Sequence, residues 1–304
     1  MSVFAIVAAL VVEQWRPLGE RRMFVAVLAR WAIWLERTFN AGEPRNGAVA
    51  WLVAVVPAVL AAYLVHAILA GASFLLALAF DVFALYLTFG FRQSSHFFTD
   101  IQLAIKSGDI DRARERVSTW RGEPVAIRSR EEVMRLAIEQ ALVASHRHVF
   151  GVLLWYVLLP GPSGAILYRL ACFLSQRWGG LGGFGRFTEK AFFLLDWPAV
   201  RLTAMAFAVV GDFEDALYCW RTQARGWPDH NAGIVLAAGA GAMGVRLGMP
   251  FQGVNGIEPR PELGVGESAD GPFLDSTVGL LWRALVLWVC LLALLSLAGL
   301  FVYL

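Results

Sequence analysis

The feature that most constrains this chain is its last stretch, where residues 285–304 run for twenty positions without a charged side chain. A helix of about 20 apolar residues crosses the hydrocarbon core of a bilayer, so this stretch predicts a membrane-spanning helix. The apolar segment begins at Val278 and is interrupted only by Arg283. Across the chain 58% of residues are hydrophobic and 16% are charged, whereas soluble domains are about one quarter charged. This composition excludes an ordinary soluble enzyme and predicts an integral membrane protein.

Two further apolar segments, residues 48–69 and 72–91, are separated by a short turn at Gly71 and predict a transmembrane hairpin. Asp81 lies inside the second segment. A carboxylate at mid-span costs about 2.5–3.5 kcal/mol on insertion scales, so we expect Asp81 to face a helix bundle or a wet cavity. Asp81 is then either a site residue or a buried carboxyl with its hydrogen bonds satisfied, and the sequence leaves both alternatives open.

The rest of the chain divides by charge and hydropathy. Residues 149–167 and 191–210 are weaker membrane candidates because they contain prolines or charges, and we expect one or both to be re-entrant or interfacial. The sequence thus predicts an all-α integral membrane protein, a helical bundle of about 4–5 membrane segments with cytoplasmic helices and loops. The expected segments are an N-terminal cytoplasmic or interfacial segment (1–47), the hairpin (48–91), a cytoplasmic helical segment (92–148), weak or re-entrant membrane segments (149–210), a cytoplasmic segment that carries motifs (211–277) and a C-terminal anchor (278–304).

Basic residues gather on both sides of the hairpin, and an excess of arginine and lysine marks cytoplasmic loops. We therefore expect a multi-pass protein whose N-terminal region is cytoplasmic, and Arg283 places residues 211–277 on the same side. The loop between the two weak segments should then be external. It nevertheless carries Arg169, Arg177, Arg186 and Lys190, so the two expectations conflict at this point.

Several classes of function are excluded or disfavoured. The net charge of +2 implies no nucleic-acid partner. Cys172, Cys219 and Cys290 are far apart and lie in apolar surroundings, and the histidines have no zinc-site spacing, so no metal site is expected. Two strings, residues 180–185 and 239–244, match GxGxxG. The second repeats small residues every fourth position, which favours close helix packing over dinucleotide binding.

Three motifs point to a known family. The string NAG at residues 231–233 is followed by AAGAGAMGVRLG at residues 237–248; AIKSGDIDRAR occupies residues 104–114, and DWPAVRLT occupies residues 196–203. Together they resemble motifs of the CobD/CbiB cobalamin-biosynthesis family over nearly the whole chain. The resemblance implies a membrane synthase that joins an aminopropanol phosphate to the propionate side chain of cobyric acid. ATP and magnesium are implied as its cosubstrate and cofactor.

Departures from the synthase signature shift the expectation to another branch of that superfamily. Of the ExxxENxxD signature the chain keeps Glu139, and Arg147 stands where the last acid would be. Arg147, the string LDWPAVRL at residues 195–202 and the string EQWRPLGE at residues 13–20 resemble AmpE proteins. That resemblance implies a regulatory or ligand-sensing protein of the bacterial inner membrane, linked to cell-wall and β-lactamase signalling. A cell-wall recycling amidase is then an expected partner.

Under this AmpE-like interpretation six residues form a ligand site. The candidates are Arg147, Arg201 and Arg246 for an anion of corrinoid, phosphate or muropeptide type, Asp196 and Asn231 to orient it, and Glu139 as a helper. Each arginine is alternatively an interfacial or ion-paired residue. The alternative function is an adenosylcobinamide-phosphate synthase, in which Glu139 and Asp196 hold magnesium. A purely structural membrane protein is the third alternative, and the sequence assigns no catalytic residue.

Overall fold

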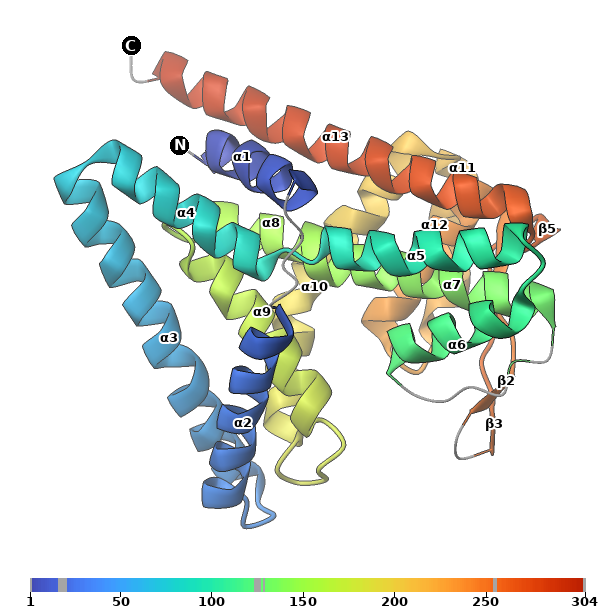
Figure 1. Ribbon diagram of the computed structural model, residues 1–304, viewed down its shortest axis with the longest axis horizontal. Helices are drawn as coiled ribbons and strands as arrows, with labels where there is room; N and C mark the ends of the chain where they lie inside the picture. Colours follow the sequence, from blue (N-terminus) through green and yellow to red (C-terminus); the bar gives the residue numbers. More distant parts are fainter. Residues whose placement is uncertain (1, 16–20, 123–126, 128, 254–255, 303–304) are drawn as a thin grey trace. The chain divides into compact units, whose positions relative to one another are not determined.

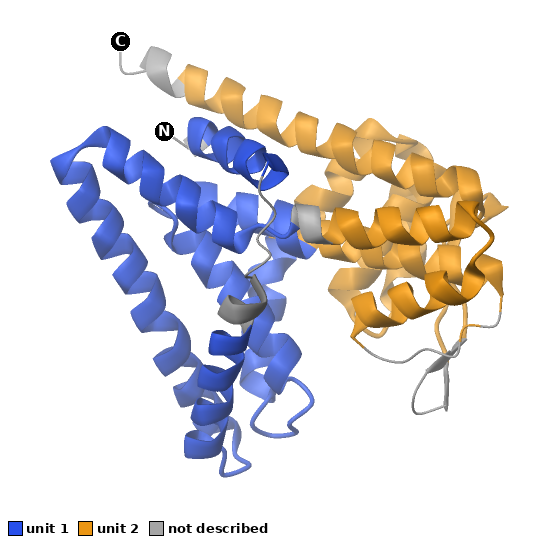
Figure 2. Cartoon of the chain, viewed as in Figure 1, with its two compact units in different colours: residues 1–90, 147–198 blue, residues 91–146, 199–304 orange. Residues whose placement is uncertain are grey.

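The computed structural model describes residues 2–15, 21–122, 127, 129–253 and 256–302 (Figure 1). Helices make up most of the described chain, and the strands are no longer than four residues, which confirms the all-α expectation. The chain forms two compact units (Figure 2). Unit 1 contains residues 1–90 and 147–198, and unit 2 contains residues 91–146 and 199–304.

Unit 1 is a bundle of helices. They are α1 (Ser2–Trp15), α2 (Arg21–Phe39), α3 (Pro44–Ala72), α4 (Phe74–Thr88), α8 (Gly151–Leu158), α9 (Ser163–Trp178) and the first part of α10 (Arg186–Val210). The segments expected to form the hairpin are α3 and α4, but α3 continues through Gly71 and the break lies at Ser73. Ser73 is extended, and its Oγ accepts a hydrogen bond from Leu75 N at 3.3 Å. A serine N-cap therefore sets the turn.

The glycine-rich string at residues 180–185 lies in the loop between α9 and α10 and serves packing. A side chain on Gly47 of α3 would collide with the Phe184 carbonyl, and one on Gly183 would collide with the Gly42 carbonyl. Gly182 has a φ of +57°, in the left-handed region. Glycine is required here because the loop backbone approaches the start of α3 closely.

Unit 2 combines helices with very short strands. Its helices are α5 (Phe91–Lys106), α6 (Ile110–Arg121), α7 (Arg130–Ser145), the second part of α10, α11 (Phe213–Gln223), the 3₁₀ turn η2 (Ala224–Gly226), α12 (His230–Met243) and α13 (Gly271–Val302). Its strands are β1 (Val245–Gly248), β2 (Phe251–Gly253), β3 (Gly256–Glu258), β4 (Glu262–Leu263) and β5 (Glu267–Ser268). β1 pairs antiparallel with β4 and parallel with β5, and β2 pairs antiparallel with β3.

The side chain of Ser129 caps the start of α7. Ser129 Oγ accepts a hydrogen bond from Glu132 N at 3.1 Å. The helix was expected to end near His148. Instead α7 continues through a π-helical turn, η1 (His146–Phe150), into α8 and ends at Leu158. Proline at position 160 then prevents further helix.

The small-residue repeat is confirmed as a close-packing surface in α12. A methyl group on Gly239 would lie 2.9 Å from Leu142 Cδ1, and one on Gly241 would collide with the Asp215 carbonyl of α11. The string at residues 237–248 is not a single helix, however. Gly244 adopts a left-handed conformation with a φ of +67°, which ends α12, and the remaining residues form β1.

Four of the described helices are long and apolar enough to cross a membrane. They are Pro44–Ala72, Arg130–Leu158, Arg186–Val210 and Gly271–Ala298. In the first and the last of these helices, 28% of the residues in the most apolar 18-residue window are buried. The corresponding share in Arg130–Leu158 is 67%. Most residues of the first and last helices in that window are therefore left uncovered by the rest of the protein. Helix α4 has 15 residues, so at about 1.5 Å per residue it is shorter than the hydrocarbon thickness.

We predict that Gly241→Ala destabilises the protein by about 1–3 kcal/mol, because the added methyl group forces α11 and α12 apart. The control is Gly279→Ala in α13, where no atom lies within 4 Å of the added methyl group. The control should be neutral or slightly stabilising, because alanine has the higher helix propensity. Thermal unfolding of both variants in detergent tests this, and equal melting temperatures would contradict it.

Candidate functional site

Glu139 lies inside unit 2, on α7, with 3% of its surface exposed. Its Oε2 accepts a hydrogen bond from Arg260 Nη1 at 2.8 Å, and its Oε1 accepts one from Gly248 N at 2.9 Å. Burial lowers the pKa of Arg260, and the nearby Glu139 carboxylate opposes part of this shift. Glu139 thus joins α7 to the end of β1 and to the loop before β4.

The backbone beside Glu139 is strained. Gly248 has a φ of +80°, and the next residue, Met249, has a φ of +68°, which is unfavourable for a residue with a Cβ. Two hydrogen bonds hold this turn: Met249 N donates to the Pro261 carbonyl at 3.2 Å, and Arg135 Nη1 donates to Met249 Sδ at 3.1 Å. The turn places the Gly248 amide where it can reach Glu139.

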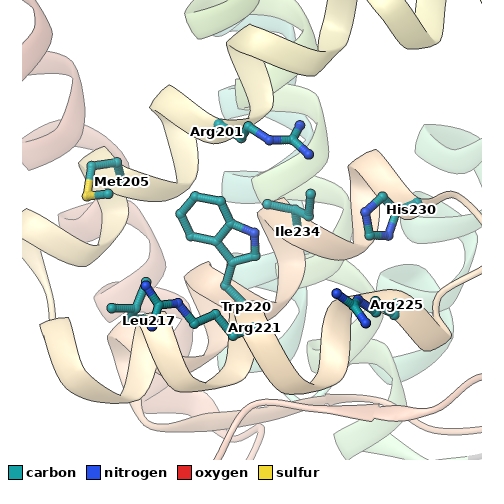
Figure 3. Close-up of a pocket in the computed structure, with 8 residues that line it drawn as sticks. All are labelled: Arg201, Met205, Leu217, Trp220, Arg221, Arg225, His230 and Ile234. Atoms are coloured by element: carbon teal, nitrogen blue, oxygen red, sulfur yellow. The ribbon is translucent and has the colours of Figure 1, made fainter.

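A basic pocket lies elsewhere in unit 2, and three α-helices and one 3₁₀ turn form it. Each helix contributes side chains four residues apart, which places them on one helix face. The lining residues are Arg201 and Met205 of α10, Leu217, Trp220 and Arg221 of α11, Arg225 of η2, and His230 and Ile234 of α12 (Figure 3). We call these eight residues the arginine pocket.

The arginine pocket is about 540 Å³ in volume and strongly cationic. Its lining combines three guanidinium groups and an imidazole with no acidic residue, as far as the structure describes the chain. In Figure 3 the side chains of Arg201, Arg225 and His230 lie on the same side of the Trp220 indole, while Arg221 extends toward Leu217. Such a pocket can bind an anion, which is the role predicted for Arg201.

Asp196 and Arg147 belong to unit 1. The Asp196 carboxylate is 1% exposed and accepts a hydrogen bond from Tyr168 Oη at 2.6 Å. The Arg147 guanidinium lies 5.8 Å from the centroid of the Phe192 ring, a cation–π distance. Both side chains contact aromatic residues within unit 1.

Asp81 also has polar partners inside unit 1. Its Oδ1 lies 2.8 Å from His66 Nδ1, and its Oδ2 accepts a hydrogen bond from Tyr156 Oη at 3.0 Å. The residue is 3% exposed. Of the two alternatives for this aspartate, the contacts support the buried carboxyl with its hydrogen bonds satisfied.

The remaining two candidates lie in unit 2. Asn231 is buried in the first turn of α12, where its backbone N donates to the capping carboxylate of Asp229. Arg246 of β1 donates from Nη2 to Ser268 Oγ at 3.2 Å, and its Nη1 lies 3.5 Å from Glu262 Oε1. Arg246 is therefore an ion-paired residue that connects β1 to both neighbouring strands.

The structure thus divides the predicted site residues between the two units. Glu139, Arg201, Asn231 and Arg246 lie in unit 2, whereas Arg147 and Asp196 lie in unit 1. Sequence reasoning missed four residues, namely Arg221, Arg225, His230 and Arg260. The cluster of Arg221 and Arg225 four positions apart, at the end of α11 and in the following 3₁₀ turn, was a usable signal. The pairing of Arg260 with Glu139 had none, because 121 positions separate the two residues.

The comparisons with known proteins cover nearly the whole chain. The sequence profile of the family described as CobD/Cbib protein matches residues 6–299. This chain belongs to the CobD/CbiB family. It is 33% identical over 301 residues to the cobalamin biosynthesis protein CobD of Stutzerimonas stutzeri, covering 96% of this chain and 97% of that protein. It is 35% identical over 221 residues to the protein of the same name from Chromobacterium violaceum, covering 71% and 70%. No solved structure matches the chain.

The expected AmpE-like regulatory function is wrong. The relatives that match most of the chain carry the name cobalamin biosynthesis protein CobD, and nothing in the comparisons supports cell-wall or β-lactamase signalling. A muropeptide ligand and a recycling amidase partner were expected under the AmpE-like interpretation. Because that interpretation is wrong, neither is expected any longer.

We predict that Glu139→Ala destabilises the protein by about 3–5 kcal/mol, because Arg260 is left as a buried charge without its carboxylate. The matched control is Glu262→Ala. Its ion pair with Arg246 is longer, at 3.5 Å, and about half exposed, so its loss should cost only about 0–1 kcal/mol. Thermal unfolding in detergent measures both, and equal stability of the two variants would contradict the role given to Glu139.

Proposed function

We propose that this chain catalyses the amide-forming step of the CobD type in cobalamin biosynthesis. This proposal rests on the match to the Stutzerimonas stutzeri protein, which extends over 96% of this chain at 33% identity. In the reaction that the family resemblance implies, a phosphorylated aminopropanol is joined to a propionate side chain of cobyric acid. The proposed activity is therefore that of an adenosylcobinamide-phosphate synthase.

The arginine pocket supports this proposal because both partners of such a reaction carry anionic groups. A guanidinium group binds a carboxylate or a phosphate through two parallel hydrogen bonds. Arg201 and Arg225, which come from different helices, can hold an anionic substrate group in a fixed orientation. Orientation of two reactants is itself a large part of the catalysis of a condensation.

The described residues do not form a protein cage for magnesium. No group of three or more histidine, cysteine, aspartate or glutamate side chains converges among them. Both Glu139 oxygens already accept hydrogen bonds, and Asp196 accepts one from Tyr168. The side chains proposed as magnesium ligands under the synthase alternative therefore have other partners, and we derive no step through the metal.

We also propose a location for the reaction. Four apolar helices and the family membership fit a multi-pass membrane protein. We place it in the bacterial inner membrane, and the excess of basic residues around the hairpin supports an N-terminal region in the cytoplasm. A corrinoid substrate made in the cytoplasm would then meet the protein at the inner face of the bilayer.

Expression of the chain in a bacterium that lacks its own synthase tests the proposed function. Cells supplied with cobyric acid and aminopropanol should regain corrinoid-dependent growth. The relative from Stutzerimonas stutzeri serves as the positive control, and feeding the amide product shows that the later steps are intact. If the chain is present in the membrane and growth returns with the relative but not with this chain, the proposed function is wrong.

A further inference from the structure

The arginine pocket carries more positive charge than one carboxylate can balance. Three guanidinium groups line it, with His230 beside them, and its lining contains no acidic residue within the described ranges. Among those same residues, no carboxylate forms an ion pair with Arg221 or Arg225. The charges of Arg221 and Arg225 are therefore available to a ligand.

We propose that the arginine pocket is a binding site for a phosphate ester. A phosphate monoester carries a charge of about −1.5 to −2 at neutral pH and has three strong acceptor oxygens. A carboxylate carries a single charge, and one guanidinium group satisfies its two oxygens. The donors Arg201, Arg225 and His230 come from α10, η2 and α12. Donors from three elements match a tetrahedral phosphate better than a planar carboxylate.

The walls of the pocket fit a short organic group attached to the phosphate. The indole of Trp220 lies at the centre of the lining, and Ile234 lies between it and His230 in Figure 3. Met205 and Leu217 complete an apolar side opposite the side of Arg225 and His230. Arg201, Arg225 and His230 therefore hold the phosphate, while the apolar side chains contact the carbon atoms of the ester and Arg221 lies beside Leu217.

Two sources can supply such a group. One is a soluble phosphate ester, and the assignment of that ester as a substrate rests on the proposed function. The other is a lipid headgroup, because apolar side chains next to the pocket are exposed: Leu202 and Val209 of α10 are 46% and 55% exposed, and Phe213 of α11 is 49% exposed. A helix face of this kind can lie at the membrane interface.

Binding to the purified full-length chain in neutral detergent tests the phosphate site. The probes are inorganic phosphate, aminopropanol phosphate and propionate, measured by titration calorimetry at low salt. We expect the phosphate ester to bind more tightly than propionate. Arg225→Ala should weaken phosphate binding roughly tenfold or more, because a charge-assisted hydrogen bond is lost. Arg225 is exposed, so this variant should fold, and its melting temperature checks that.

The matched control is Arg112→Ala, an exposed arginine of α6 in the same unit, which should change the affinity by less than about twofold. A second arm uses nanodiscs of phosphatidylglycerol or phosphatidylcholine. If Arg225→Ala weakens binding of the soluble ester, or of phosphatidylglycerol alone, the phosphate site is supported and its source is identified. If Arg225→Ala binds every phosphate probe as the wild type does, or propionate binds as tightly as the ester, the proposal is wrong.

Failure of this inference and failure of the proposed function have different signatures. A chain that binds phosphate through Arg225 and yet does not restore growth has the site but not the synthase activity. A chain that restores growth while Arg225→Ala binds phosphate normally has the activity but uses another site for the phosphate.

Discussion

Hydrocarbon offers no hydrogen-bond partner to a peptide group, and the fold of this chain follows from that constraint. Each membrane segment must satisfy its backbone internally, so the apolar sequence forms helices such as Pro44–Ala72 and Gly271–Ala298. Strands occur only between residues 245 and 268 of the described chain, outside the four candidate spans. In this region, glycines such as Gly244 and Gly248 adopt the left-handed conformation that tight turns require.

The same constraint determines how charges are placed. Inside the protein, carboxylates are held by named donors: Glu139 by Arg260 and Gly248, Asp196 by Tyr168, and Asp81 by Tyr156. These contacts satisfy groups that would otherwise be costly to bury. The arginine pocket differs, because its cationic groups line an open volume without an acidic neighbour in the described lining. The hydrogen-bonded carboxylates therefore stabilise the fold, whereas the cationic side chains of the arginine pocket are suited to binding a ligand.

Much of the fold was predictable because membrane helices are read from local sequence. The all-α class, the helix N-cap at Ser129 and the small-residue repeat of α12 all rest on residues a few positions apart. The continuation of α7 to Leu158 was missed, since the π-helical turn carries a charged HRH sequence that resembles a helix end. The pairing of Glu139 with Arg260 was missed because it joins distant positions. The branch of the family was misjudged from a few substitutions and short strings, whereas comparison over the whole chain was decisive.

The central claim is that this membrane protein forms an amide bond between a phosphorylated amino alcohol and a corrinoid carboxylate. Mass spectrometry of the corrinoid, after incubation with the purified chain in nanodiscs together with ATP, magnesium and both substrates, tests it most directly. The account predicts a new species heavier than cobyric acid by the amino alcohol phosphate less one water, formed only when the chain is present. Unchanged cobyric acid, under conditions in which the Stutzerimonas stutzeri relative forms the product, would contradict it.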